Sequence, residues 1–133
     1  MDLEILKIAS NTKNHKNIKN FTHFCKNRNR ICGDVMEISI IVKNNKITDF
    51  GYQCKSCIYC QASVSLLSQN VINLGLKEVL ELLKQSEFFF EKKENETLKK
   101  WKSLGKIINE KNISRKDCLL LPFTTLSKAL KNE

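Results

Sequence analysis

A segment of alternating apolar residues, followed by helical patterns, is the feature that most limits how this chain can fold. In "VMEISIIVKNNKITDFGY", every second residue over 36–42 is apolar, which is typical of a strand with one buried face. Asn44 and Asn45 suit a tight turn, because asparagine tolerates positive φ. The segment therefore predicts a β-hairpin whose return strand covers about Lys46–Gln53.

Helical periodicity dominates the rest of the chain. The expected helices cover residues 2–9, 57–73, 76–89 and 96–110, and a last helix follows Cys118. Ser56 is the expected N-cap of the helix over 57–73, and Pro122, which is tolerated best in a first turn, places the last helix start near Cys118. A further strand is expected around Phe21–Lys26. Strands first and helices later indicate an α+β fold, a small antiparallel sheet of about three strands with helices packed on it.

The length of 133 residues fits one domain, in which residues 1–20 form a short helix and a polar loop that is a candidate for mobility. Nothing approaches the ~20 consecutive apolar residues of a membrane span, and the start "MDLEILKIAS" lacks the pattern of a signal peptide, so we expect a cytoplasmic protein. The net charge is +9, but the basic residues are scattered. Scattered charge favours solvated faces over a nucleic-acid stripe, and it could also attract an acidic protein partner.

Six cysteines in a reducing compartment indicate metal binding or thiol chemistry before a disulfide framework. Three of them, Cys54, Cys57 and Cys60, form two overlapping CxxC pairs in "YQCKSCIYCQAS". The plain alternative is that some of these cysteines are buried core residues and that their CxxC spacing is accidental. For the isolated Cys25, a small buried hydrophobic residue is the expected reading.

The hairpin brings two cysteines together. Cys32 precedes its first strand and Cys57 follows its second, so the two are expected to be neighbours. Gly33 permits a tight turn that directs Asp34 to the same place. Cys118 sits at another expected helix start, although sequence alone does not bring it to the others.

Helix starts matter because the macrodipole places about +0.5 elementary charge there. A thiol at such a position has a lowered pKa, and its thiolate is both a nucleophile and a metal ligand. This argument favours Cys57 over Cys54 and Cys60. Three thiolates and one carboxylate would suit a tetrahedral Zn²⁺ ion, with the carboxylate as the more exchangeable ligand.

At these residues the sequence resembles a known family. "CGDVMEISIIV", "ITDFGYQCKSCIYCQASVSLL" and "RKDCLLLPFTTLSKAL" resemble the U-type iron-sulfur scaffolds, that is, the NifU N-terminal domain, IscU and SufU. The resemblance implies the IscU/SufU-like fold and a ligand set of Cys32, Asp34, Cys57 and Cys118, with Cys60 as an alternate ligand. Cys54 has no expected counterpart. Asp117 stands where the IscU branch has histidine, and together with Arg115 it places the chain closer to SufU and NifU-like proteins.

The resemblance also implies a function. Such proteins accept sulfur from a cysteine desulfurase as a persulfide, here on Cys57 or Cys118. They hold a labile 2Fe-2S cluster and pass it to apo iron-sulfur proteins or cluster carriers. This is the work of a carrier more than of an enzyme. The first alternative is a zinc-dependent persulfide acceptor of the SufU type, closer to a sulfurtransferase.

Two further readings come from other classes. A thiol oxidoreductase could use Cys54 with Cys57 or Cys57 with Cys60, but the chain lacks the βαβ setting of thioredoxins. A basic zinc module could bind nucleic acid, and salt-dependent binding would support that reading. We rank both below the scaffold and the sulfur acceptor.

Overall fold

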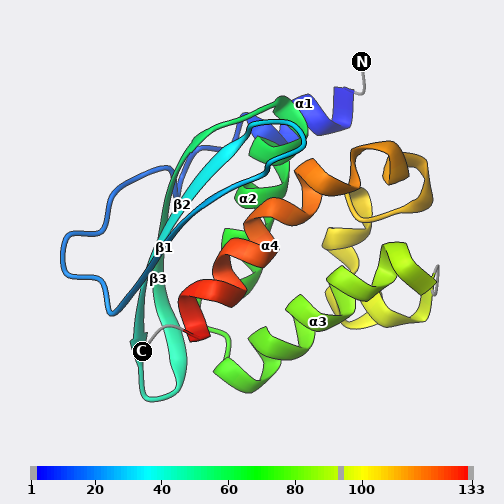
Figure 1. The fold of residues 1–133 in the computed structure, drawn as a ribbon. Helices are drawn as coiled ribbons and strands as arrows, with labels where there is room; N and C mark the ends of the chain where they lie inside the picture. Colours follow the sequence, from blue (N-terminus) through cyan, green and yellow to red (C-terminus); the bar gives the residue numbers. More distant parts are fainter. Residues whose placement is uncertain (1–2, 93–94, 132–133) are drawn as a thin grey trace.

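The computed structural model describes residues 3–92 and 95–131, and it places a three-stranded antiparallel sheet against a layer of helices (Figure 1). The strand order is β1-β2-β3. The elements are α1 (Leu3–Ala9), β1 (His23–Arg28), β2 (Val35–Lys43), β3 (Lys46–Lys55), α2 (Ile58–Val71), α3 (Leu76–Lys92), η1 (Asn95–Lys106), η2 (Glu110–Arg115) and α4 (Lys116–Lys131). The α+β fold expected from the sequence is confirmed.

The hairpin is the element that the sequence predicts best. Asn44 and Asn45 have φ values of 52° and 61°, and they join β2 to β3. Met36, Ile38 and Ile40 are completely buried against the helices. The register shifts by one residue beyond Ile41, which leaves the last pairs of the hairpin on a bulge.

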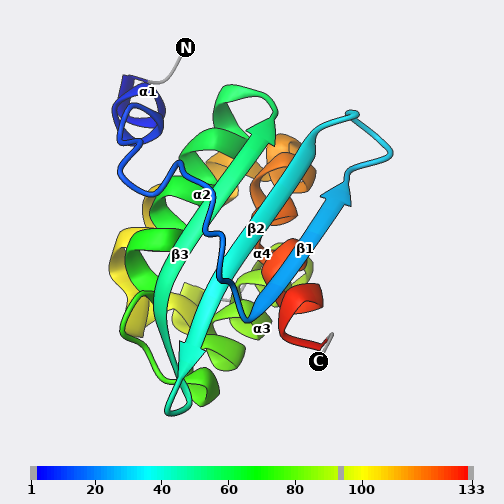
Figure 2. The same ribbon diagram turned by 90° about the vertical axis from the view of Figure 1, so that its left-hand side faces the viewer.

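The two faces of the sheet are covered differently. Helices α2 and α4 pack on one face, and α3 lies beyond them, while the chain between α1 and β1 crosses the other face (Figure 2). Gly51 permits that crossing, because a Cβ atom built there would come within 2.5 Å of the Lys16 carbonyl oxygen. The Asn14 side chain donates to the Ser68 hydroxyl at 2.9 Å, and Lys16 pairs with Asp49 at 2.9 Å. The polar loop is therefore tied to the sheet and to α2.

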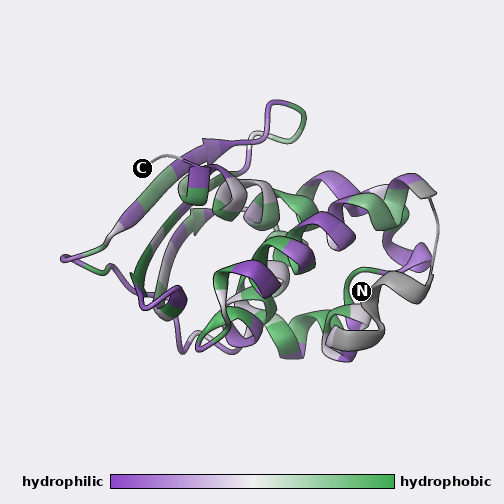
Figure 3. Ribbon diagram, turned by 90° about the horizontal axis from the view of Figure 1, so that it is seen from below, coloured by the Kyte–Doolittle hydropathy of each residue, from purple (hydrophilic) through white to green (hydrophobic). Residues whose placement is uncertain are grey.

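Helix α2 is the centre of the core, and apolar residues line the space between the layers (Figure 3). Most of its surface is buried, yet three of the buried residues are serines: Ser63, Ser65 and Ser68. Each hydroxyl bonds a neighbouring segment or its own helix, which satisfies the polar atom inside the core. Small side chains at these positions let α1 and α4 approach α2 closely.

Two local predictions are wrong. The helix expected over 96–110 is instead η1, of 3-10 type, with a break at Trp101 (φ −124°, ψ 67°), followed by the separate η2. The apolar spacing in this region is retained, since Trp101, Leu104 and Ile107 are buried, but the backbone follows the core and not one straight axis. Helix α4 begins at Lys116, so Pro122 is its seventh residue and not part of its first turn. Proline has no N–H, and the Cys118 carbonyl therefore loses its usual helical donor.

Among the described residues, no helix has both the length and the apolar character needed to cross a membrane.

Candidate metal centre

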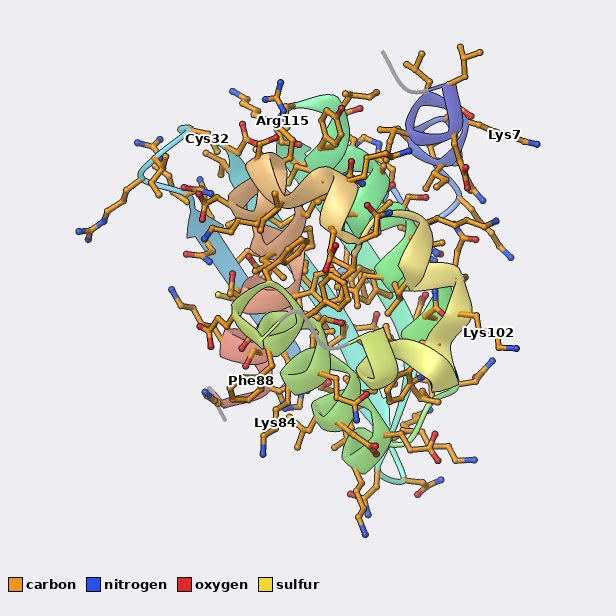
Figure 4. The ribbon with its side chains drawn as sticks, turned by 90° about the vertical axis from the view of Figure 1, so that its right-hand side faces the viewer. Lys7, Cys32, Lys84, Phe88, Lys102 and Arg115 are labelled. Carbon is orange, nitrogen blue, oxygen red and sulfur yellow. The ribbon has the colours of Figure 1, made fainter. Side chains whose placement is uncertain are left out.

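Five segments meet at one end of the molecule. They are the turn between β1 and β2, the end of β3, the start of α2, the end of η2 and the start of α4. Cys32 and Arg115 mark this end in Figure 4, whereas Lys84 and Phe88 lie toward the other. Each cysteine that the sequence nominates as a ligand comes from one of these segments.

Three potential ligands converge here. One sulfur or oxygen atom from each of Cys32, Asp34 and Cys118 lies within 4.8 Å of the other two. The thiols of Cys32 and Cys118 are 3.8 Å apart, although 86 positions separate them in the chain. Cys32 is exposed, whereas Asp34 and Cys118 are buried. The group is thus open to solvent from the side of Cys32.

The turn that carries Cys32 and Asp34 is held by Asn29. The Gly33 amide donates to the Asn29 carbonyl at 2.7 Å, and the Asn29 amide donates to the Asp34 carbonyl at 2.8 Å. The Asn29 side chain accepts from the Ile31 amide at 2.9 Å and donates to the Asp117 carbonyl at 3.1 Å. Gly33 has φ +78°, a conformation that side chains with a Cβ disfavour. The sequence analysis identified Gly33 but not Asn29, whose contact with Asp117 joins two segments that are 88 positions apart in the chain.

Cys57 lies at the edge of this group. It is the N-cap residue of α2, and its amide donates to an Asp34 carboxylate oxygen at 3.4 Å. Its thiol interacts with the Cys118 thiol, yet it is outside the set of atoms that lie within 4.8 Å of one another. The structure therefore brings Cys57 next to the centre, where it is the fourth candidate ligand.

The buried half of the centre is built by contacts between α2 and α4. The Ser63 hydroxyl donates to the Leu119 carbonyl, one residue beyond Cys118. The Arg115 guanidinium lies over the Tyr59 ring, 5.1 Å from its centroid, and so ties the end of η2, directly before α4, to the first turn of α2. Ser63 belongs to the segment "ITDFGYQCKSCIYCQASVSLL" that carries the family resemblance, and the structure gives it a positioning role.

Charge at the centre differs from the sequence-based expectation. The pKa of the Cys118 thiol lies well above its ordinary value, first because of burial and then because of the neighbouring Cys57 and Cys32 thiols. For Cys118 the expected lowering by a helix start is therefore wrong, since burial outweighs the partial charge of the macrodipole. A bound cation would reverse this balance, because metal ligation deprotonates thiols. The donor set of thiols and carboxylate fits such a cation.

Burial governs the two remaining thiols near Cys57, those of Cys60 and Cys54. Cys60 is completely buried, and burial raises its pKa strongly. Cys54 is half-buried, and burial raises its pKa as well. Ser56 does not cap α2 as expected: the cap position belongs to Cys57, and the buried Ser56 hydroxyl has no hydrogen-bond partner of nitrogen or oxygen among the described residues. It lies instead beside Cys54 and Cys60, where it lowers the pKa of both against the larger effect of burial.

Comparison with known proteins finds similar chains over most of the sequence. The NifU-like N-terminal domain family matches residues 2–114. The iron-sulfur cluster assembly scaffold protein IscU of Thermotoga maritima is 27% identical over 128 residues, covering 96% of this chain and 89% of that protein.

Solved structures agree in fold. A protein from Fervidobacterium islandicum, assigned as an iron-sulfur cluster assembly scaffold for the SUF system, matches with a TM-score of 0.87 and 27% identity, over 98% of this chain and 96% of that one. The N-terminal part of a nitrogen-fixing NifU-like protein from Brucella abortus matches with a TM-score of 0.79 at 18% identity, over 98% and 91% of the two chains. The likeness extends over the whole described fold, including the start of α4 that lies beyond the family match.

Proposed function

Because this chain belongs to the NifU-like N-terminal domain family, we propose that it is an iron-sulfur cluster assembly scaffold. In this role it accepts sulfur from a cysteine desulfurase, holds a labile 2Fe-2S cluster as cargo, and passes it to an apo iron-sulfur protein. The observation that carries the proposal is the convergence of Cys32, Asp34 and Cys118, with Cys57 beside them. Thiolates are the usual protein ligands of such clusters.

Sulfur acceptance needs a nucleophilic thiol that a partner can reach. Cys57 and Cys118 are the candidates, and Cys57 is the more exposed of the two. Its thiolate would attack the outer sulfur of the desulfurase persulfide. A new S–S bond would then form on the scaffold, and the desulfurase cysteine would leave as a thiolate.

Cluster release depends on an exchangeable ligand. Asp34 offers a carboxylate among thiols, and a harder oxygen ligand is more easily replaced by an incoming sulfur on iron or zinc. Its carboxylate also accepts from the Cys57 amide, so the same side chain positions the start of α2. We infer that Asp34 sets how quickly the cargo leaves.

The rim of the centre supports docking of an acidic protein surface. Ile31, next to Cys32, is 80% exposed, and it lines a surface cavity with three basic residues, Arg28, Arg30 and Lys128, and one acidic residue, Asp117. An exposed apolar residue within a positive field favours a partner with a negative rim and an apolar centre. A cysteine desulfurase with such a surface is the partner that we propose for this end of the molecule.

A zinc-dependent persulfide acceptor is the second candidate. It is favoured by the donor chemistry, because three thiolates and a carboxylate also satisfy tetrahedral Zn²⁺. Zinc would then be a resident ion, held by Cys32, Asp34, Cys57 and Cys118, and it would stabilise the thiolate forms of its ligands. Sulfur transfer from Cys57 or Cys118 would follow without cluster assembly.

One reconstitution experiment separates the two candidates. The anaerobic protein is mixed with a cysteine desulfurase, cysteine and ferrous iron, and then assayed for iron, acid-labile sulfide and visible absorption. The scaffold predicts about two irons and two sulfides per site with thiolate-to-iron charge-transfer bands, followed by transfer to an apo-ferredoxin. Tight stoichiometric zinc with persulfide and no cluster would replace the scaffold by the zinc-dependent acceptor. Neither metal nor persulfide would reject both.

A further inference from the structure

Cys54 is a further thiol near Cys57 that the expected ligand set does not include. It is the penultimate residue of β3, opposite Met36 of β2, and it precedes Cys57 by three residues. The end of β3 and the start of α2 carry these two cysteines three residues apart, and the pKa of Cys54 is raised first by burial and then by the nearby Asp34 and Cys57. Cys57 therefore has Cys54 as a thiol neighbour in addition to Cys118.

Cys54 also has its own opening. It lines a cavity of about 240 Å³ between β3 and the chain that follows α1, together with Thr12, His15, Tyr52 and Gln61. The His15 ring packs on Tyr52 with centroids 5.3 Å apart, and Gln61 bonds the Ser56 carbonyl at 2.9 Å. The cavity has room and polar groups for a molecule of amino-acid size, but not for a protein domain. Small molecules could therefore reach Cys54 by a route separate from the exposed side of the metal centre.

We propose that Cys54 is a resolving thiol that reduces the persulfide on Cys57 and so releases sulfide into the metal centre. This inference rests on the proposed scaffold function, with Cys57 as the sulfur acceptor. It assigns a chemical role to a thiol that the expected ligand set leaves unused.

The step balances without an added electron donor. The Cys54 thiolate attacks the inner sulfur of the Cys57 persulfide, a Cys54–Cys57 disulfide forms, and the bond to the outer sulfur breaks. The outer sulfur leaves as hydrosulfide, and it is thereby reduced by two electrons, while the two cysteines are oxidised. Because the Cys57 thiol interacts with Cys118, the hydrosulfide leaves beside the thiols that would bind iron.

A small thiol closes the cycle through the cavity. Its thiolate attacks Cys54 and frees the Cys57 thiolate, and a second thiol molecule then releases Cys54 by forming the small-molecule disulfide. The net reaction converts one persulfide and two small thiols to one cysteine, one sulfide and one small disulfide. Cys60 has the same spacing from Cys57 but is completely buried, which removes it from such an exchange.

The test is a single turnover without added thiol. The anaerobic protein is loaded by a desulfurase with ³⁵S-labelled cysteine and freed of donor, and then persulfide, sulfide and linked peptides are followed over time. Wild type should release one sulfide per Cys57 persulfide and gain a Cys54–Cys57 link. Cys54→Ser should load equally but release at least tenfold more slowly, and Cys25→Ser, which changes a thiol on β1, should behave as wild type.

Each other outcome has a definite meaning. Equal release from Cys54→Ser, or loss of release in Cys60→Ala together with a Cys57–Cys60 link in wild type, would overturn the role of Cys54 and leave the scaffold function intact. A stable persulfide in wild type would do the same. Absence of persulfide on Cys57 in wild type would overturn the assignment of Cys57 as acceptor, and the resolving role with it.

Discussion

The two halves of the metal centre are built in opposite ways. Cys32 is exposed on a short turn that polar contacts of Asn29 hold in place. Cys118 is only 7% exposed in the first turn of α4, where Ser63 and the core fix the backbone around it. A rigid, buried ligand and an adjustable, exposed one can hold a cluster and still let it leave. We therefore expect the α4 half to retain the cluster and the turn to exchange it.

Removal of the buried thiol should have the largest effect. Cys118→Ser takes away a ligand whose place no exposed side chain can fill, so we predict loss of essentially all cluster retention after reconstitution. Iron and acid-labile sulfide measured after gel filtration check this. Cys25→Ser, a buried thiol on β1, is the control and should retain the wild-type content. A stable cluster in Cys118→Ser would assign the buried half a purely structural role.

Loss of the exchangeable ligand should act on rate more than on retention. In Asp34→Ala the oxygen ligand is gone, and release of the cluster to an apo-ferredoxin should slow several-fold. The decay of the cluster absorption in the presence of the acceptor measures the rate. Unchanged or faster release would mean that Asp34 is not the ligand whose exchange sets the rate of release.

The conformation of the turn should contribute a smaller effect, on stability. Gly33→Ala forces a Cβ into positive φ, which costs about 1–2 kcal/mol, although nothing lies within 4 Å of that Cβ. Gly105→Ala is the matched control, because its Cβ also meets open space and its φ is not in the positive range. The free energy of unfolding, measured in urea, should be lower than in wild type for Gly33→Ala and not for Gly105→Ala. Equal changes in the free energy of unfolding of both variants would mean that the positive φ of residue 33 imposes no additional cost on a residue with a Cβ.

Alkaline pH should produce the smallest and most gradual effect. Burial raises the pKa of several thiols above the ordinary value of 9.0, and it does so strongly for the core residue Cys60. Above that pH the unfolded chain loses the proton while the folded chain retains it, so the free energy of unfolding should fall as pH rises beyond about 9. Below that pH the Cys60 thiol keeps its proton in both the folded and the unfolded chain, so it does not change the free energy of unfolding as pH varies.

Unfolding in urea across this range, under reducing conditions, measures the slope. Cys60→Ala should flatten it by at most about 1.4 kcal/mol per pH unit. An equal slope in wild type and Cys60→Ala would show that Cys60 ionises as readily in the folded protein as in the unfolded chain.

The sequence predicts local pattern better than the contacts that join distant segments. Alternation over 36–42 and the Asn44–Asn45 turn specify the hairpin, since both act between neighbours in the chain. The placement of Cys118 beside Cys32 depends on packing of α4 against β1, β2 and α2, which no local pattern encodes. The break at Trp101 and the unused cap at Ser56 have the same origin, because tertiary packing overrides local preference.

In the metal centre too, local features could be predicted from the sequence, whereas features that depend on distant segments could not. The turn chemistry of Gly33 and the nearness of Cys32 to Cys57 follow from hairpin geometry. The raised pKa of Cys118 does not, because it depends on burial and on two thiols from other segments. Asn29 was missed for the same reason, since its partner Asp117 belongs to the start of α4.

The ligand set of the loaded protein tests the proposed metal centre most directly. X-ray absorption of the zinc-loaded form distinguishes sulfur near 2.3 Å from oxygen or nitrogen near 2.0–2.2 Å. With Cys32, Asp34, Cys57 and Cys118 as ligands, we predict three sulfurs and one oxygen, changing to fewer sulfurs in Cys57→Ser. Four sulfurs in the wild-type protein, or a spectrum that Cys57→Ser leaves unchanged, would contradict the proposed centre.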